Sequence, residues 1–308
     1  MKAAVFLLCL APLAAQAPKR PVPSGQIPTS AEGKIVVEVP RVPLLFTVTD
    51  KKGRFVTDLE QKDFKVSDNR KPQGILAFNR ESDLPLRIGI LIDTSNSVRE
   101  RFRFEQEAAI EFSKGVLKEE KDKAFLVRFD TAAELVVNFT HDVERLAKGI
   151  RDQRPGGGTA LYDAIYYSCR DKLPEESPPE QFRRALVVLS DGDDNLSRMS
   201  REQALEMCHK AEAVIFTIST NRSGVQMDGD KVLKRFSEQT GGLSFQPFQA
   251  SDLGQSFENI ANELRHQYFL LYAPSPFVAD GRFHEVEVKT NNKDFRVRCR
   301  RGYYAPQR

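Results

Sequence analysis

Four nearly continuous apolar runs constrain the fold of this chain more than any other feature of its sequence. The runs are LRIGILID (86–93), AFLVRFD (124–130), ALVVLSD (185–191) and AVIFTIS (213–219). Strands that are apolar on both faces belong to a parallel sheet that helices cover on both sides. Amphipathic segments separate the runs, so the sequence predicts an α/β fold with a doubly wound, mostly parallel sheet and helices on both faces.

Helical spacing and capping residues mark the segments between these runs. One helix is predicted from about Arg103 to Lys118, because Ala108, Ala109, Phe112 and Val116 fall on one face. Side chains that can cap a helix N-terminus precede three further helices. These residues are Asp142, Ser200 with Gln203 three positions later, and Ser251.

Segments of β-strand character flank the α/β region on both sides. Residues 34–85 and 268–308 contain short apolar runs separated by polar turns, whereas residues 86–267 carry the strand–helix alternation. The ends of an α/β domain often come close in space. We therefore expect the two flanking segments to pack together as a small β-rich subdomain beside an α/β domain of residues 86–267.

The run FRVRCR near the C-terminus alternates strictly between apolar and basic side chains. Phe295, Val297 and Cys299 fall on one face and would point inward. The other face carries Arg296, Arg298 and Arg300. We interpret these arginines as a solvated face that protects an edge strand. A basic docking face is the alternative, and the sequence leaves it open.

The first residues have the composition of an export signal. Residues 1–17 combine one lysine, an apolar core and an Ala-Gln-Ala ending, which predicts a signal peptide cleaved after Ala17. Residues 18–33 are rich in proline and small polar residues and predict a flexible linker. No later segment is apolar enough to span a membrane, so we expect an exported protein, secreted or periplasmic.

Cysteine content and net charge narrow the classes of partner. Removing the signal peptide leaves Cys169, Cys208 and Cys299, with no CxxC pair and only four histidines, so a zinc site is not expected. Buried packing is the simplest interpretation of the cysteines. A Cys169–Cys208 bridge is an alternative, because both residues fall on helices that flank one strand. The formal net charge of +3 does not favour nucleic acid as a partner.

Oxygen-bearing side chains gather where the predicted parallel strands end. Asp93 ends the first run, with Ser95 and Ser97 after it; Thr159 follows three glycines, and Asp191 ends a third run. Binding sites of doubly wound sheets lie at the carboxyl ends of the strands. Two carboxylates and three hydroxyls form a hard-oxygen ligand set, which predicts Mg²⁺, with Mn²⁺ or Ca²⁺ as alternatives. We predict no catalytic residue and no organic cofactor.

These motifs resemble a known family. The sequences DTSNS, GGTALYDAI and LSDG are similar to the metal-ion-dependent adhesion site of von Willebrand factor type A domains. The resemblance spans about residues 86–267 and implies that the five residues above hold the metal directly or through water. With its flanks, the whole chain resembles the exported VWFA-related domain proteins described chiefly from acidobacteria. Asn96 departs from the pattern, which most often has glycine at this position.

The resemblance implies protein binding, in which an Asp or Glu of the partner completes the coordination of the metal. Adhesion or an interaction in the cell envelope would fit such a module. A metal-dependent hydrolase is one alternative, for which Asp193, Asp194 and His141 are the candidate bases. A structural scaffold, in which the metal only ties three loops together, is the other.

Overall fold

The structure of this chain is a computed structural model that describes residues 41–80, 84–118, 120–176, 182–221, 223, 225–247 and 250–307. The predicted signal peptide (1–17) and linker (18–33) lie outside these residues, as do residues 34–40 of the N-terminal β segment. None of the described helices is both long and apolar enough to cross a membrane.

A six-stranded sheet forms the centre of the α/β part, in the order β10-β9-β8-β5-β6-β7. Five strands run parallel and β7 is antiparallel to β6 at the edge. The strands are β5 Leu86–Asp93, β6 Lys123–Phe129, β7 Ala133–Thr140, β8 Arg183–Ser190, β9 Val214–Ser219 and β10 Ser244–Phe245. All eight residues of β5 and all eight of β8 are buried, as expected for strands covered on both faces.

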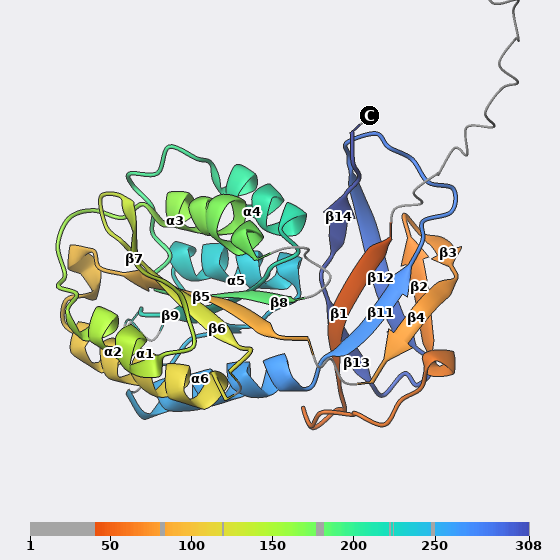
Figure 1. The fold of residues 1–308 in the computed structure, drawn as a ribbon, viewed down its shortest axis with the longest axis horizontal. Helices are drawn as coiled ribbons and strands as arrows, with labels where there is room; N and C mark the ends of the chain where they lie inside the picture. Colours follow the sequence, from red (N-terminus) through yellow and green to blue (C-terminus); the bar gives the residue numbers. More distant parts are fainter. Residues whose placement is uncertain are drawn as a thin grey trace, which may run out of the picture. The chain divides into compact units, whose positions relative to one another are not determined.

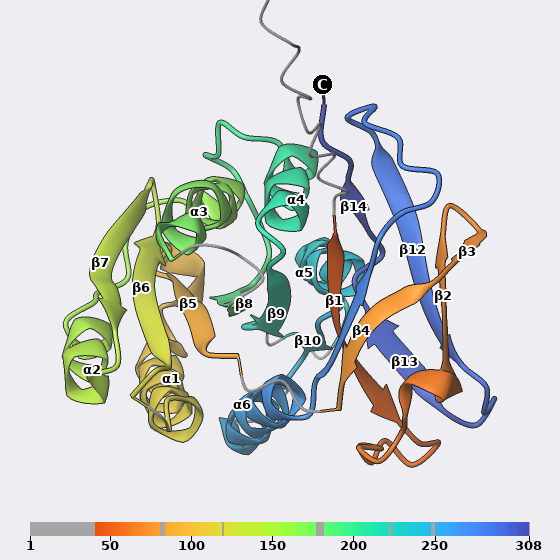
Figure 2. The same cartoon turned by 45° about the vertical axis from the view of Figure 1, so that its right-hand side comes forward.

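Helices cover both faces of this sheet (Figure 2). One apolar cluster joins the sheet to α1 Phe102–Val116, α2 Val143–Arg151 and α6 Ala250–Arg265. A second cluster joins the other face to α3 Leu161–Tyr167, α4 Arg201–Lys210 and α5 Asp228–Thr240. This arrangement confirms the predicted doubly wound α/β fold.

Two four-stranded antiparallel sheets lie beside the α/β part (Figure 1). Their orders are β13-β1-β11-β4 and β14-β12-β2-β3, so each combines strands from before residue 86 with strands from after residue 267. The strands are β1 Val42–Thr49, β2 Phe64–Asp68, β3 Lys71–Gln73, β4 Ile75–Asn79, β11 Tyr268–Tyr272, β12 Phe283–Thr290, β13 Arg296–Cys299 and β14 Gly302–Tyr304. Residues 39–308 form one compact unit, and the domain boundaries at 85/86 and 267/268 stay predictions.

Aromatic side chains fill the core between these two sheets. The rings of Phe46 and Tyr268 stack with their centroids 5.4 Å apart, and Phe64 meets Phe46 edge-on at 5.1 Å. Tyr268 is fully buried, and its hydroxyl donates to the carbonyl of Val56. Burying an aromatic ring contributes a large apolar area, so this cluster is the main apolar contact between the N- and C-terminal strands.

Two β segments of the flanking regions are interrupted in the structure. The stretch from Asp63 to Asn79 forms β2, β3 and β4. Asn69 and Arg70, both with positive φ, form the turn between β2 and β3, and Gly74 separates β3 from β4, which belong to different sheets. The C-terminal run is interrupted between Cys299 and Gly302, which separates β13 from β14. Two strands of the central sheet, β7 and β10, were not predicted.

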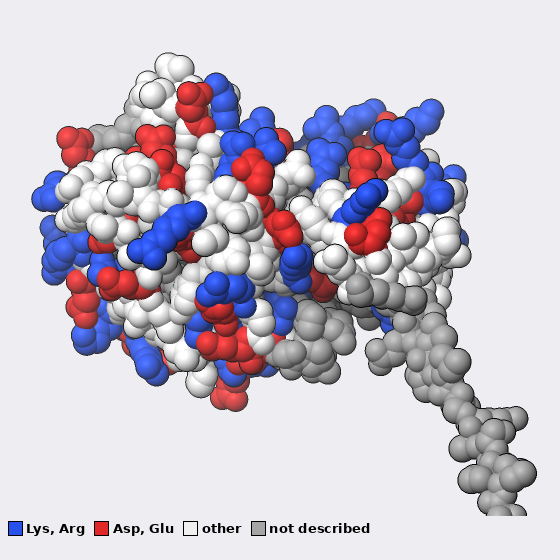
Figure 3. Space-filling view, turned by 90° about the horizontal axis from the view of Figure 1, so that it is seen from above, with Lys and Arg blue, Asp and Glu red and all other residues white. Residues whose placement is uncertain are grey.

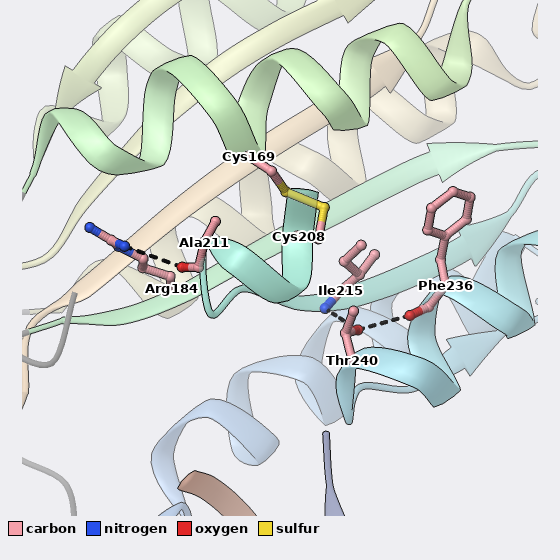
Figure 4. The surroundings of a disulfide bond; sticks show 7 residues. All are labelled: Cys169, Arg184, Cys208, Ala211, Ile215, Phe236 and Thr240. Carbon is pink, nitrogen blue, oxygen red and sulfur yellow. Dashed lines mark hydrogen bonds between the residues drawn. A yellow bond between two sulfur atoms is a disulfide. The ribbon is translucent and has the colours of Figure 1, made fainter. Parts of the chain in front are cut away.

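A disulfide joins the two helical cysteines (Figure 4). Cys169 lies in a short π-helical turn that continues α3, and Cys208 lies in α4. Both residues are buried, and their Cα atoms are 5.1 Å apart. The alternative left open by the sequence is therefore the one the structure adopts, whereas Cys299 stays a free thiol.

This pairing predicts the thiol count of a protein that lacks residues 1–17. In denaturant without reductant, a chromogenic thiol reagent should detect one thiol per chain, that of Cys299; after reduction it should detect three. Cys208→Ser should give two thiols without reductant, because Cys169 loses its partner. Three thiols in the unreduced wild-type protein would contradict the bridge.

Candidate metal centre

Four of the five predicted site residues lie at or just after the ends of two parallel strands, and the fifth, Thr159, precedes a helix. Asp93 is the last residue of β5, and Ser95 and Ser97 follow in the turn that leads to α1. Thr159 lies two residues before α3, and Asp191 directly follows β8. Because β5 and β8 are parallel neighbours, both carboxylates lie at the same edge of the sheet.

The carboxylate of Asp93 is fully buried and held by two hydrogen bonds. The backbone N–H of Ser95 donates to Oδ1 at 2.8 Å, and the hydroxyl of Ser190 donates to Oδ2 at 2.7 Å. Ser190 Oγ also accepts from the backbone N–H of Gly192 at 3.0 Å. These bonds fix the direction of the carboxylate and tie the end of β5 to the end of β8.

The two serine hydroxyls extend from this carboxylate toward the surface. Ser95 is buried and Ser97 is exposed, and their Oγ atoms lie 2.8 Å apart. Two hydroxyls at this separation can share a hydrogen bond or face a common ligand. The group is therefore open to solvent on the Ser97 side and closed on the Asp93 side.

Hydrogen bonds connect three loops around these side chains. The carbonyl of Gly157 accepts from the backbone N–H of Asn96 at 3.3 Å and from its side-chain amide at 3.2 Å. The backbone N–H of Thr159 donates to the side chain of Asn195 at 2.9 Å, and the N–H of Asn195 donates back to the carbonyl of Thr159. The loops that carry Ser95, Thr159 and Asp191 thus form one bonded unit.

Backbone conformation explains two of the glycines and the departure at Asn96. Gly157 (φ +78°) and Gly192 (φ +84°) adopt left-handed conformations that disfavour other residues. Asn96 instead lies in a short right-handed 3₁₀ turn, Asn96–Val98. Glycine is therefore not required at position 96, and the asparagine side chain bridges to Gly157.

Three carboxyl groups near this edge of the sheet influence one another. Burial raises the pKa of Asp93 to about 6, with a further rise from the charge of Asp191, although the bonds from Ser190 and Ser95 oppose it. Burial also raises the pKa of Glu105, in α1, to about 8; Arg101 lowers it, and Asp93 and Asp191 raise it. Without a cation, the site disfavours negative charge.

Two of the candidate catalytic bases, His141 and Asp194, are not placed for catalysis at this site. Thr140, at the end of β7, pairs with Ala124 at the start of β6, so His141 lies at the opposite end of the sheet from Asp93. The prediction that His141 is near the site is wrong, because β7 runs antiparallel. The carboxylate of Asp194 accepts from the backbone N–H of Tyr162 and the hydroxyl of Ser197, which orders its loop.

Two site residues were not predicted from the sequence. Ser190 binds the carboxylate of Asp93, and Asn195 holds the backbone of Thr159. The bond from Ser190 joins residues 97 positions apart in the sequence, so no local pattern marked it. Among the described residues, no cluster of three or more His, Cys, Asp or Glu side chains could hold a metal. Any cation here would need hydroxyl ligands.

A comparison with protein-family models matches part of the chain. Residues 88–193 match the model of the von Willebrand factor type A domain. The matched segment contains all five predicted ligands, whereas Asn195, which binds the backbone of Thr159, lies just beyond it. No curated protein matches the chain significantly in sequence.

Solved structures with a similar fold share little sequence with this chain. The three N-terminal domains of the type V pili tip protein Mfa5 from Porphyromonas gingivalis align with a TM-score of 0.50 at 13% identity, over 72% of this chain and 55% of that one. An aerotolerance-related membrane protein from Bacteroides fragilis aligns with a TM-score of 0.46 at 18% identity, over 58% of this chain and 98% of that one. Proximal thread matrix protein 1 from the mussel byssus, in a structure with a zinc occupied MIDAS motif, aligns with a TM-score of 0.48 at 16% identity, over 59% of this chain and 48% of that one.

Proposed function

We propose that this chain, which contains a von Willebrand factor type A domain, is an exported module that binds a protein partner through a divalent cation. The observation that carries the proposal is the hydrogen-bonded group of side-chain oxygens at the carboxyl ends of β5 and β8. Asp93, Ser95, Ser97, Thr159 and Asp191 would hold the cation directly or through water. Such a cation would offset the burial and, to a smaller extent, the charge of Asp191, which together raise the pKa of Asp93.

The chemistry of the donor set favours Mg²⁺. Magnesium binds six oxygens at about 2.0–2.1 Å, so neighbouring ligands of an octahedral site lie about 3.0 Å apart. The 2.8 Å separation of Ser95 Oγ and Ser97 Oγ is close to this value. The two carboxylates would balance the charge of a divalent ion. Five protein side chains supply few oxygens for calcium, which takes six to eight, so the set favours magnesium or manganese.

An acidic partner suits the position of the site. Ser97 is exposed whereas Asp93 is buried, so any open coordination position would face solvent. A carboxylate from another protein would fill it with a charge-assisted contact. The buried Cys169–Cys208 bridge supports export, because disulfides persist in oxidising compartments.

Calorimetric titration of Mg²⁺ and Mn²⁺ tests the metal site. We expect saturable binding of one ion to the wild-type protein and at least about a 100-fold weaker affinity for Asp93→Ala, because a ligand affects affinity more than the supporting residues do. The matched control is Asp193→Ala, which removes an exposed carboxylate two residues from Asp191. It should bind as the wild type does.

Two results would contradict the proposal. Equal affinities of wild type and Asp93→Ala would place the cation elsewhere. For the partner, immobilised wild-type protein should retain a protein from the source organism in Mg²⁺ but not in EDTA, and Asp93→Ala should retain none. Retention that is unchanged by EDTA would rule out a cation-mediated contact.

A further inference from the structure

A cleft that is separate from the candidate metal centre is lined by residues of the α/β part and of the antiparallel sheets. Its volume is about 610 Å³, within the range of ligand-binding sites in proteins. Its lining includes Gly242, Leu243, Ser244 and Gln246, in and around β10, and the segment Arg296–Arg301, which contains β13. None of the five predicted metal ligands lines this cleft.

Each of these two lining segments contains an edge strand of a sheet. β10 is the last strand of the six-stranded sheet, and β13 is the last strand of the sheet β13-β1-β11-β4. In the part of the chain that the structure describes, no further strand pairs with the outer side of either one. An edge strand presents backbone N–H and C=O groups to which an extended peptide can add.

Basic side chains dominate the lining of the cleft. Its five basic residues outnumber the two acidic ones, Glu238 and Glu287. The basic residues are Lys234, Arg296, Arg298, Arg300 and Arg301. Figure 3 shows acidic and basic side chains interspersed on one face of the molecule, and the formal net charge of the chain is only +3, so the excess in the cleft is local.

The charges within the cleft are unevenly compensated. Arg298 pairs with Glu263, which is buried, whereas Arg296 and Arg301 are exposed and have no side-chain partner among the described residues. Glu287 pairs with Lys289 at 2.8 Å, so part of the acidic charge is already neutralised. Arg296 and Arg301 are therefore free to bind an incoming anion.

Arg300 also lines the cleft, but its guanidinium is bonded to residues outside this lining. It is only 8% exposed, so the prediction that all three alternating arginines form a solvated face is wrong. Its Nη2 donates to the carbonyl of Pro43 and lies 3.4 Å from Glu212, while Nε and Nη1 have no partner among the described residues. Together with burial, which is the larger cause, Arg300 lowers the pKa of His209 to about 4.

We propose that this cleft binds an extended, acidic polypeptide segment without a metal ion. The unpaired arginines would bind its carboxylates, for which the guanidinium group gives two parallel hydrogen bonds. The sheet edges would bind its backbone. No aromatic side chain of the described residues lines the cleft, which disfavours single-stranded nucleic acid, because its bases stack on aromatic rings.

Fluorescence anisotropy with a labelled hexaglutamate peptide, in EDTA, tests the proposal. The chelator removes any contribution from the metal centre, so failure here is distinct from failure of the proposed function. We expect Arg296→Gln/Arg301→Gln to bind about 100-fold more weakly than wild type, about tenfold for each arginine replaced. The control Arg103→Gln/Arg151→Gln removes two exposed arginines in α1 and α2 and should bind normally.

Competitors distinguish a peptide site from a general anion site. Unlabelled hexaglutamate should displace the probe, whereas hexaglutamine and inorganic phosphate at equal concentration should not. Displacement by phosphate as effective as by hexaglutamate would overturn the peptide assignment. Absence of probe binding to wild type, or equal loss in the two double variants, would also overturn the proposal.

Discussion

Replacing Asp68 with alanine is expected to lower the free energy of unfolding by about 4 kcal/mol, because three buried polar groups lose their partner. Asp68 ends β2 and is only 5% exposed. Its Oδ2 accepts from the hydroxyls of Tyr272 and Tyr303, each at 2.9 Å, and its Oδ1 lies 3.2 Å from Nδ1 of His284.

The network joins strands from both ends of the chain. Asp68 comes from β2, whereas Tyr272, His284 and Tyr303 come from β11, β12 and β14. Burial raises the pKa of both tyrosines and the charge of Asp68 raises it further, so both hydroxyls keep their protons and donate. Loss of the carboxylate therefore weakens the hold between strands that are more than 200 residues apart in sequence.

Equilibrium unfolding in urea would measure this effect, with Asp280→Ala as the control. Asp280 also faces His284, at 3.4 Å from Nε2, but its side chain is 32% exposed. Its removal should cost much less, because solvent screens contacts of an exposed carboxylate. Equal destabilisation by the two substitutions would show that the buried network has no special role.

The central strands could be predicted because burial on both faces leaves an unbroken apolar run in the sequence. The missed strands lack this signature. β7 is an edge strand with several exposed residues, Glu134 and Leu135 among them, and β10 has only two residues. Their existence depends on pairing with β6 and β9, which periodicity alone does not encode.

The site residues that could be predicted are those that follow directly from the order and direction of the central strands. Asp93 and Asp191 could be predicted as neighbours because parallel strands end at one edge of the sheet. His141 was misplaced, because the reversal of β7 carries it to the opposite edge. The buried side of Glu105 and the bond from Ser190 to Asp93 depend on how a helix and a second strand pack, so neither has a local sequence pattern.

In the absence of metal, Asp93→Asn is expected to stabilise the protein at pH 7 by about 3 kcal/mol while removing cation binding. Burial raises the pKa of Asp93 from 3.8 to about 6, and each unit is equivalent to about 1.4 kcal/mol. Asparagine avoids the cost of a buried charge. Its amide can still accept from the N–H of Ser95 and can donate to Ser190 Oγ.

The direction of the pH dependence follows from this shift. Near pH 3 the carboxyl is mostly protonated in both folded and unfolded chains, so wild type and variant should differ little. Between about pH 4 and 6 the unfolded chain releases the proton first, and the wild type loses stability relative to Asp93→Asn. Above about pH 6 both states are ionised, and the difference should be constant.

Thermal unfolding in EDTA and in Mg²⁺, from pH 3 to pH 8, would separate the two roles of Asp93. Magnesium should raise the midpoint of the wild type, because a ligand of the folded state stabilises it by mass action, and should leave Asp93→Asn unchanged. The control Asp152→Asn removes an exposed carboxylate whose pKa is lowered, mainly by Lys148, so it should not stabilise the protein. A metal-free Asp93→Asn protein less stable than wild type at pH 7 would show that the Asp93 charge supports the fold, in which case the site would not be strained without its cation.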